Sequence, residues 1–377
     1  MNDDIKVCYS GFLDASSGMG EAARNIVAAL YTSGVEITTE VIPNIHARID
    51  LGNSYNITKS LQGRPIDYDF KIIHITPDLI TNYFTPQKYH IFHLFWETDS
   101  LPKWWVWALN LCDEIWTGDQ RQADNFKKSG VWRNIWVCPQ PIDTSITSAN
   151  KFTIKGHEGF TFYSIFQWIE RKNPKGLIEA YWREFEGDKN IALIIKTFKD
   201  KFTTDEIIKI RQDIENWRKE VKLKHYPKIG LLIEAWDKKD MFRLHTTGDC
   251  FVSAHRGEGW SVPAVEAMMI GKPIVSTGLG GIHEHAPDDT MYKVKYEWKN
   301  VHDMNWAPWY DETQQWGEPD ITDLRAKMRQ VYEHQDEAKQ MGERAKKYVV
   351  DNLNFLRVGN KMKSRLEAIK KDIIDKV

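Results

Sequence analysis

The sequence predicts an α/β protein with two doubly wound domains, each built on a Rossmann-like parallel sheet. Short apolar runs alternate with helical segments along both halves of the chain, which is typical of parallel sheets covered by helices. A polar stretch without periodicity, residues 143–159, separates the halves and is interpreted as a linker. At 377 residues, 42% of them hydrophobic, the chain is long enough for two cores of ordinary size.

In the first half we expect strands and helices that alternate as far as Pro139 and Pro141. Its apolar runs predict strands at 5–10, 36–42, 70–75, 90–95, 114–117 and 135–138. The periodic segments between them predict helices at 21–33, 104–111 and 121–129.

The second half repeats this alternation. We expect strands at 160–165, 191–195, 229–233, 250–253 and 273–276. We expect helices at 174–185, 204–221 and 239–246, another helix that begins near Pro263, and a polar helix from Thr322.

Charge and cysteine content limit the protein class. The 51 lysines and arginines nearly balance 53 acidic residues, so the chain has no overall attraction to nucleic acid or anionic membranes, although peripheral membrane contact stays open. The four cysteines lie far apart without a Cys-x-x-Cys pair, which favours neither a zinc site nor a disulfide framework. An acidic N-terminus and the lack of an apolar run of about 20 residues predict a cytoplasmic protein without a transmembrane segment.

Residues 255–273 carry most of the functional information. The run 250–253 breaks at Gly257-Glu258-Gly259, and a helix follows with Pro263 in its first turn. Backbone amides at such a helix N-terminus bind anions; here they belong to Gly259, Trp260, Ser261 and Val262. Glu258 and Glu266 flank this anion site. We interpret it as a nucleotide-sugar site, in which amides hold the diphosphate and carboxylates accept sugar hydroxyls; the alternative is a plain turn with two solvent-facing glutamates.

The segment from Glu258 to Pro263, followed by Glu266-Ala267-Met268, resembles the Glu-x7-Glu signature of family-4 retaining glycosyltransferases (glycosyl transferases group 1). Trp260 stands for the usual Phe, and Ser261 for the usual second Gly. The resemblance is strong over 160–284, moderate at the first loop and weak between 42 and 70. It implies the GT-B fold, in which two Rossmann-like domains face each other across a cleft.

The resemblance also implies the domain organisation. Residues 1–148 form the acceptor-side domain, and the last helix, at about 355–377, returns to it. Residues 149–354 form the donor-binding domain. Ligands of doubly wound sheets bind beyond the carboxyl ends of the strands, where the loops of both domains meet.

Two cations follow the first strand of the second half. Lys172 matches the lysine of the family, and Arg171 is expected to replace the family arginine, whose position holds Gln167. Both suit the charge of a departing diphosphate, although a surface Arg-Lys pair is common. Lys196 and Thr197, at another strand end, are assigned to the donor phosphates. Gly281 is assigned to the donor as well, because its turn resembles the Gly-Gly-x-x-Glu turn of the family.

The first half contributes the remaining candidates. Gly18 and Gly20 lie between the first strand and first helix, in a spacing unlike a dinucleotide fingerprint but similar to the glycine-rich loop of the family. An ordinary turn is the alternative. Glu97, or else His93, is assigned to the acceptor hydroxyl, whereas His74 is more simply a core histidine. The 16 tryptophans gather mainly at 96–136 and 298–316; stacking on sugars or bases is conceivable, but packing is favoured for any one of them.

The resemblance, taken with these residues, implies a retaining, metal-independent glycosyltransferase. It moves a hexose from a UDP- or GDP-linked sugar, which is a co-substrate rather than a cofactor, to a hydroxyl of a glycan or lipid-linked sugar. No metal is expected because no Asp-x-Asp stands at a strand end. The alternatives are transfer to hydroxylated bases of phage DNA, a sugar-nucleotide epimerase or phosphorylase, and a non-catalytic sugar-nucleotide binder.

Overall fold

The computed structural model describes residues 5–43, 49–146 and 149–375. The chain divides into two compact units, Met1–Ile146 with Val349–Val377, and Thr147–Tyr348. The sequence interpretation set the boundaries at 148 and 354. Residue 148, and the last two residues of the expected C-terminal helix, lie outside the described part.

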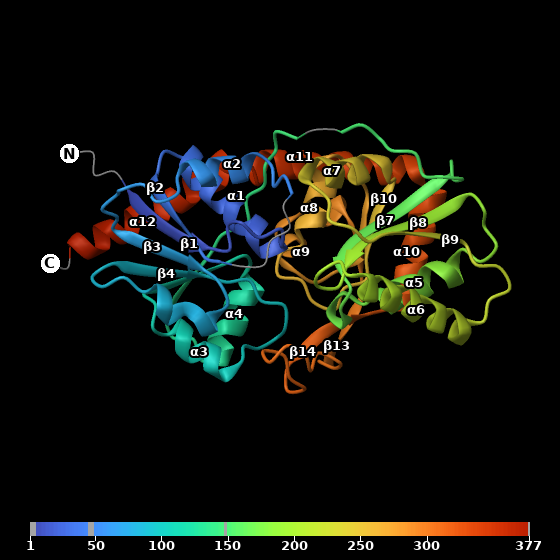
Figure 1. The fold of residues 1–377 in the computed structure, drawn as a ribbon, viewed down its shortest axis with the longest axis horizontal. Coiled ribbons are helices and arrows are strands. Elements are labelled where there is room, and N and C mark those ends of the chain that lie inside the picture. Colours follow the sequence, from blue (N-terminus) through green and yellow to red (C-terminus); the bar gives the residue numbers. More distant parts are fainter. Residues whose placement is uncertain (1–4, 44–48, 147–148, 376–377) are drawn as a thin grey trace. The chain divides into compact units, whose positions relative to one another are not determined.

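Unit 1 is built on a six-stranded parallel sheet with the order β2-β1-β3-β4-β5-β6 (Figure 1). Its strands are β1 (Lys6–Gly11), β2 (Glu36–Val41), β3 (Phe70–His74), β4 (Tyr89–His93), β5 (Glu114–Thr117) and β6 (Asn134–Val137). Its helices are α1 (Gly18–Thr32), α2 (Asn53–Ser60), η1 (Pro77–Tyr83), α3 (Lys103–Leu109), α4 (Gln120–Ser129) and α12 (Phe355–Ile374).

Helix α12 completes unit 1 by packing along α1, as Figure 1 shows within this unit. Val358, Met362, Leu366 and Ile369 form a stripe at helical spacing that is buried in the core of unit 1. Gly359 lets the two helix backbones come close, because a Cβ there would overlap the carbonyl of Ala29. The packing of α12 therefore rests on sequence features that lie more than 300 residues from α1.

Unit 2 contains the second six-stranded parallel sheet, with the order β12-β11-β10-β7-β8-β9. Its strands are β7 (Phe160–Gln167), β8 (Ile191–Phe198), β9 (Lys228–Leu232), β10 (Cys250–Ser253), β11 (Ile274–Thr277) and β12 (Tyr292–Val294). Its helices are η2 (Glu170–Lys172), α5 (Pro174–Glu184), α6 (Thr204–Val221), α7 (Lys238–Thr247), α8 (Val262–Met269), α9 (Gly281–His285), η3 (Asp288–Thr290) and α10 (Ile321–Glu333). Helix α11 (Gln335–Asn352) contains the boundary between the units.

Some elements differ from the expectation. Helix α1 begins at Gly18 rather than residue 21, because the Ser17 side chain accepts the amide of Gly20 and caps the helix there. Helix α2 was not predicted, since its sequence is polar and its buried residues are Ser54 and Thr58. A small antiparallel hairpin, β13 (Tyr296–Asn300) with β14 (Gln315–Pro319), occupies the stretch that the sequence left without a strand.

Candidate active site

The loop between β10 and α8 is shaped by Ser261, the residue before the helix. Ser261 has a left-handed backbone (φ 69°, ψ 65°), and its carbonyl accepts the amides of Ala264 at 3.1 Å and Val265 at 3.2 Å. Pro263 stands in the first turn, where no intrahelical bond is lost. The chain thus turns sharply from the strand end into the helix, whose N-terminus carries partial positive charge.

Lys172 and Glu258 form an ion pair that joins the loops after β7 and β10. Arg171 donates to the carbonyl of Gly257 at 2.7 Å, and its own carbonyl accepts the amide of Arg256 at 2.7 Å. Burial acts to raise the pKa of Glu258, but the charges of Lys172 and Arg171 outweigh it, and that pKa falls to about 2. Three of the predicted catalytic groups therefore lie together, with the carboxylate ionised at neutral pH.

His255 anchors the same loop through hydrogen bonds of its buried ring. It is buried, and its Nδ1 lies 3.0 Å from Ser253 Oγ while its Nε2 lies 2.7 Å from the carbonyl of Leu279. Nε2 must donate to that carbonyl, so Nδ1 of the neutral ring accepts the Ser253 hydroxyl. Burial lowers the pKa of His255 to about 4, which keeps the ring neutral beside the charged groups.

Arg256 holds the hairpin β13–β14 against this loop. Its guanidinium binds Glu170 at 2.6 Å and Glu318 at 2.5 Å and lies over the ring of Trp316 at 5.3 Å. The amide of Gly317 donates to the Arg256 carbonyl at 2.8 Å. Arg256, two residues before Glu258 in the sequence, therefore has a structural role: it links η2 to the hairpin.

Glu266 is buried inside unit 2 rather than facing solvent. One of its oxygens pairs with Lys238, and the other lies 3.1 Å from His245 Nε2. The second ring nitrogen of His245 lies 3.0 Å from the hydroxyl of Tyr163. Burial opposes ionisation of Glu266, yet Lys238 and His245 lower its pKa. The two glutamates of the motif are thus each paired with a lysine.

Lys196 and Thr197 lie near the carboxyl end of strand β8, two residues and one residue before its last residue, and are both buried. The ammonium of Lys196 lies over the rings of Phe202 at 5.3 Å and Trp236 at 5.7 Å. Burial lowers its pKa to about 8, against the opposing charge of Glu234, so this lysine is still mostly protonated at neutral pH. Thr197 Oγ1 has no hydrogen-bond partner among the described residues.

Gly281 and Trp260 determine how closely α9 approaches the motif loop. The amide of Gly281 donates to the Gly259 carbonyl at 3.2 Å, and a Cβ on Gly281 would overlap the indole of Trp260. Trp260 is buried and its ring also contacts His285 at 5.4 Å. The Trp260 side chain therefore packs inside the loop, and its backbone N–H is the group that remains suited to a ligand.

The glycine-rich loop of unit 1 is held by Arg24. Its guanidinium donates to the carbonyls of Leu13 at 3.1 Å and Ala15 at 2.6 Å. Gly20 packs against the loop backbone where a Cβ would overlap the Ala15 carbonyl, whereas the surroundings of Gly18 are open. Gly18 therefore offers the more accessible backbone of the two.

The acceptor-side candidates lie at and after the end of β4. His93 is buried, with its Nδ1 3.4 Å from Nδ1 of His74, and its ring packs edge-on against Phe95 at 4.9 Å. Burial and His74 lower the pKa of His93 well below its usual value. Glu97, in the loop after the strand, is partly exposed. Glu97 therefore stays the preferred candidate for contact with an acceptor.

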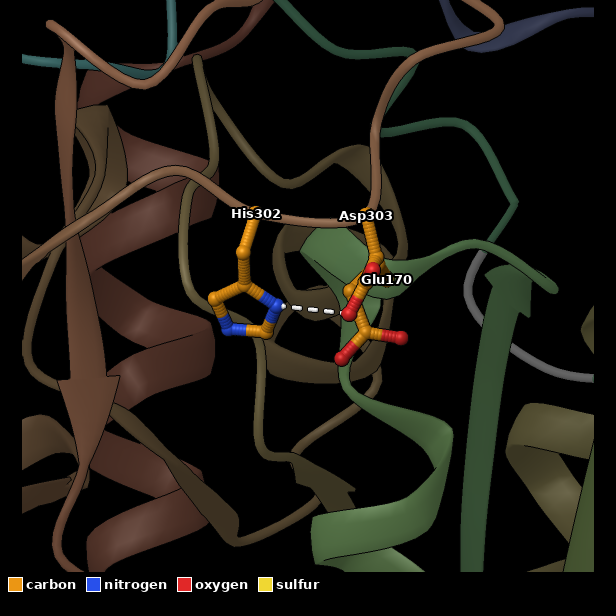
Figure 2. Close-up of side chains that lie close together, drawn as sticks. All are labelled: Glu170, His302 and Asp303. Carbon is orange, nitrogen blue, oxygen red and sulfur yellow. Dashed lines mark hydrogen bonds and ion pairs between the residues drawn. The ribbon is translucent and has the colours of Figure 1, made fainter.

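One side-chain cluster in unit 2 has the chemistry of a metal site. Figure 2 shows Glu170, His302 and Asp303, each offering a ligand atom within 4.8 Å of the others. His302 Nδ1 lies 3.0 Å from Asp303 Oδ2, and Glu170 already pairs with Arg256. His302 and Asp303 are largely exposed. Glu170 belongs to η2 together with Arg171 and Lys172, so a divalent cation held by this cluster would lie close in the chain to two of the candidate catalytic groups.

Sequence reasoning missed the partners of the motif. Lys238 and His245 reach Glu266 from α7, 28 and 21 residues earlier in the chain, with no spacing that marks them. His255 and Arg256 stand inside the quoted motif, and their consecutive position beside Glu258 was the available signal. Glu318 stands in the segment 316–319, which resembles the C-terminal region of the family, but nothing there pointed to Arg256 as its partner.

Residues 187–300 match the family model described as glycosyl transferases group 1, a region inside unit 2 that includes Glu258 and Glu266. A comparison with curated proteins found no match. The whole chain is similar in structure to HepE of Anabaena in complex with UDP-glucose, with a TM-score of 0.67 and 13% identity over 97% of this chain and 100% of that one.

Two synthases show the same likeness. Sucrose-phosphate synthase from Thermosynechococcus elongatus matches with a TM-score of 0.67 at 12% identity, over 98% of this chain and 100% of that one. The trehalose-6-phosphate synthase OtsA matches with a TM-score of 0.64 at 11% identity, over 97% and 99%. At these identities the likeness concerns the fold. This chain has the GT-B fold, as the motif resemblance implied, and its residues 187–300 match the glycosyl transferases group 1.

Proposed function

We propose that this chain is a retaining, metal-independent glycosyltransferase that moves a hexose from a nucleoside diphosphate sugar to a hydroxyl of a glycan or lipid-linked sugar. The observation that carries the proposal is the ion pair of Lys172 with Glu258, with Arg171 bound to the same loop. Glu258 lies in the region that matches group 1 glycosyl transferases, and HepE, which shares the fold, binds UDP-glucose.

In the proposed reaction the bond between the anomeric carbon and the diphosphate oxygen breaks. The acceptor oxygen forms its bond to the same carbon on the same face, and its proton passes to the leaving phosphate. Lys172 and Arg171 stabilise the charge that develops on the diphosphate, which is the largest electrostatic demand of the step. Glu258 accepts hydrogen bonds from sugar hydroxyls.

The other assignments concern the position of the donor. The amides of 259–262 and the mostly protonated Lys196, with Thr197, face the phosphates in this proposal, and Glu266 holds the ribose. The backbone at Gly281 and at Gly18 and Gly20 lies close to the nucleotide and its phosphates. Glu97 orients the acceptor hydroxyl, in preference to the buried His93.

The first test is a thermal-shift and hydrolysis panel over UDP-, GDP- and ADP-glucose with the full chain. We expect one base family to raise the melting temperature of the wild type, because a ligand that binds only the folded state stabilises it. Glu258→Ala and Lys172→Ala should abolish the shift and lower hydrolysis about 100-fold or more. Lys175→Ala is the matched control, since Lys175 pairs with the exposed Glu220 on the surface.

The outcomes separate the alternatives. If no sugar nucleotide stabilises the wild type, the donor site is wrong. If donors bind but no sugar is released or transferred, the non-catalytic binder is favoured, and recovery of an isomeric sugar nucleotide would point to an epimerase. The anomeric configuration of the transfer product, measured by NMR, tests retention directly.

Metal independence has its own test at the cluster of Figure 2. We expect turnover to be unchanged by a chelator and by His302→Ala, because Lys172 and Arg171 stabilise the leaving group without a cation. A rise in turnover with Mg²⁺ or Mn²⁺ that His302→Ala removes would show that Glu170, His302 and Asp303 bring a metal into the reaction.

The acceptor is tested last. The near-neutral net charge of −2 disfavours DNA, whose binding needs cations along the phosphates. Transfer to lipid-linked or free oligosaccharides should therefore change little with ionic strength. Transfer to hydroxylated DNA, with activity that falls steeply as salt rises, would establish the alternative acceptor.

A further inference from the structure

A group of large apolar side chains is exposed on unit 1, none of them among the residues assigned above. Trp104, Trp107, Leu111 and Trp132 are 43%, 63%, 39% and 69% exposed, and we call these four the tryptophan surface. Contiguous exposed apolar side chains are uncommon on soluble proteins and mark interaction sites. Trp105, between two of them, is instead buried and packs edge-on against Trp96 at 4.6 Å.

The four residues form one surface although they come from two segments. Trp104, Trp107 and Leu111 are three and four residues apart, so they lie on one side of α3 and the turn that follows it. Asn110 ties the second segment to this turn: its side chain binds the Gly130 carbonyl at 3.1 Å and the Trp132 amide at 3.0 Å. Figure 1 shows α3 and α4 next to each other at this end of unit 1.

Cations surround the tryptophan surface. Lys103 begins α3, Lys127 and Lys128 lie in the last turn of α4, and all three are exposed without an ion pair in the described part of the chain. Arg133 lies over the ring of Trp132 at 4.0 Å. The carboxylates of Asp113 and of the exposed Asp124 on α4 offset part of this charge, and the four cations outnumber them. The rim is therefore positively charged, although the whole chain is not.

We propose that the tryptophan surface docks this protein onto an anionic membrane surface. Indole rings concentrate at the membrane–water interface, and each nearby lysine or arginine is attracted to anionic headgroups. No helix among the described residues is long and apolar enough to span a bilayer, so contact at the interface is the mode that this surface allows. The inference goes beyond the glycosyltransferase proposal and does not depend on it.

The chemistry of the rim argues against other occupants. Protein interfaces are depleted in lysine, which disfavours a protein partner at a rim that carries Lys103, Lys127 and Lys128. A sugar site needs polar side chains aimed at the ligand. The adjacent Asn110 instead spends both atoms of its side-chain amide on backbone partners.

The test is sedimentation of the full chain with vesicles of phosphatidylcholine alone or mixed with phosphatidylglycerol. We expect binding to the mixed vesicles, weakened by salt, and at least tenfold weaker partition for the double variant Trp107→Ser/Trp132→Ser. Lys127→Glu/Lys128→Glu should lose the preference for anionic vesicles. Brominated lipid should quench indole fluorescence in the wild type but less in the tryptophan variant.

Trp298→Ser/Trp306→Ser in unit 2 is the matched control, because those indoles are also exposed, at 41% and 59%. It should bind vesicles like the wild type, and every variant should keep the wild-type melting temperature. The proposal is overturned if the wild type does not bind mixed vesicles, or if the control loses binding equally. It is also overturned if the tryptophan variant abolishes self-association or binding of a free oligosaccharide instead. None of these measurements requires a donor, so they stand apart from the test of catalysis.

Discussion

Ser261 is the residue at which this chain departs most clearly from the family pattern. The usual glycine at this place tolerates a positive φ, whereas a serine in the left-handed region is strained. Its hydroxyl has no hydrogen bond to the described residues that would offset the strain. The serine therefore stands where backbone geometry favours glycine, directly at the N-terminus of α8.

Ser261→Gly should raise the free energy of unfolding by about 1 kcal/mol, because glycine adopts this backbone without the Cβ clash. For a unit of this size the melting temperature should rise by about 2–4 °C. Thermal unfolding with and without the best sugar nucleotide measures both effects. A lower melting temperature for the glycine variant would mean that the hydroxyl has a stabilising contact.

His245 is the second residue whose role can be tested alone. It links the buried Tyr163 hydroxyl and Glu266 carboxylate. His245→Phe leaves both groups without this partner and should lower the free energy of unfolding by about 1–3 kcal/mol, whereas His245→Gln keeps a donor and should cost less. Urea unfolding measures the free energy of unfolding of both variants. Equal values for His245→Phe and His245→Gln would show that the hydrogen bonds of His245 contribute nothing to stability.

At the scale of elements, α12 depends on close backbone contact rather than on side chains alone. Its apolar stripe enters the core of unit 1, and Gly359 lies against the end of α1. Lys363 also donates to the carbonyl of Ser33 at 3.3 Å, and Arg365 pairs with the buried Glu114. The helix is thereby fixed at three points along its length.

Gly359→Ala should lower the free energy of unfolding by about 1–3 kcal/mol, because the added Cβ pushes α12 away from α1. Helix propensity alone would predict the opposite sign. Ser364→Ala on the exposed side of the same helix is the control and should be neutral or slightly stabilising. If Gly359→Ala raises the melting temperature as much as the control, the close contact is absent in solution.

At the scale of the whole molecule, buried neutral histidines set the acid limit of stability. Burial lowers the pKa of His74 to about 3, and that of His255 to about 4, from the usual 6.5. Below pH 6.5 the unfolded chain binds protons that the folded chain does not, so stability is complete above this pH and falls as the pH drops toward 4. Glu258, with its pKa near 2, adds a loss that begins only below 4.5.

Urea unfolding between about pH 7 and pH 5 should therefore show the free energy of unfolding falling with a slope that steepens toward about 1.4 kcal/mol per pH unit for each such histidine. His74→Gln should remove the contribution of one histidine, which corresponds to one bound proton, from this slope. A wild type whose stability is flat across this window would contradict the burial of these rings in their neutral form.

Local pattern was enough for the architecture. Apolar runs and helical periodicity predicted all six strands of the first sheet and five of the second, because strands buried in a parallel sheet are apolar along their length; the edge strand β12 was missed. The meeting of Lys172 with Glu258 could also be anticipated, because the carboxyl ends of parallel strands lie along one edge. The polar α2 and the hairpin β13–β14 escaped prediction, because neither has an apolar period of its own.

Contacts between distant segments were out of reach of the sequence. Lys238 and His245 meet Glu266, and Glu318 meets Arg256, only because the chain returns from far away, and no spacing encodes such a return. The burial of His93 depends on one-residue register at a strand end, which apolar pattern does not resolve. Fold and the main motif thus follow from local chemistry, whereas the partners that set the charge of each glutamate arise from three-dimensional packing.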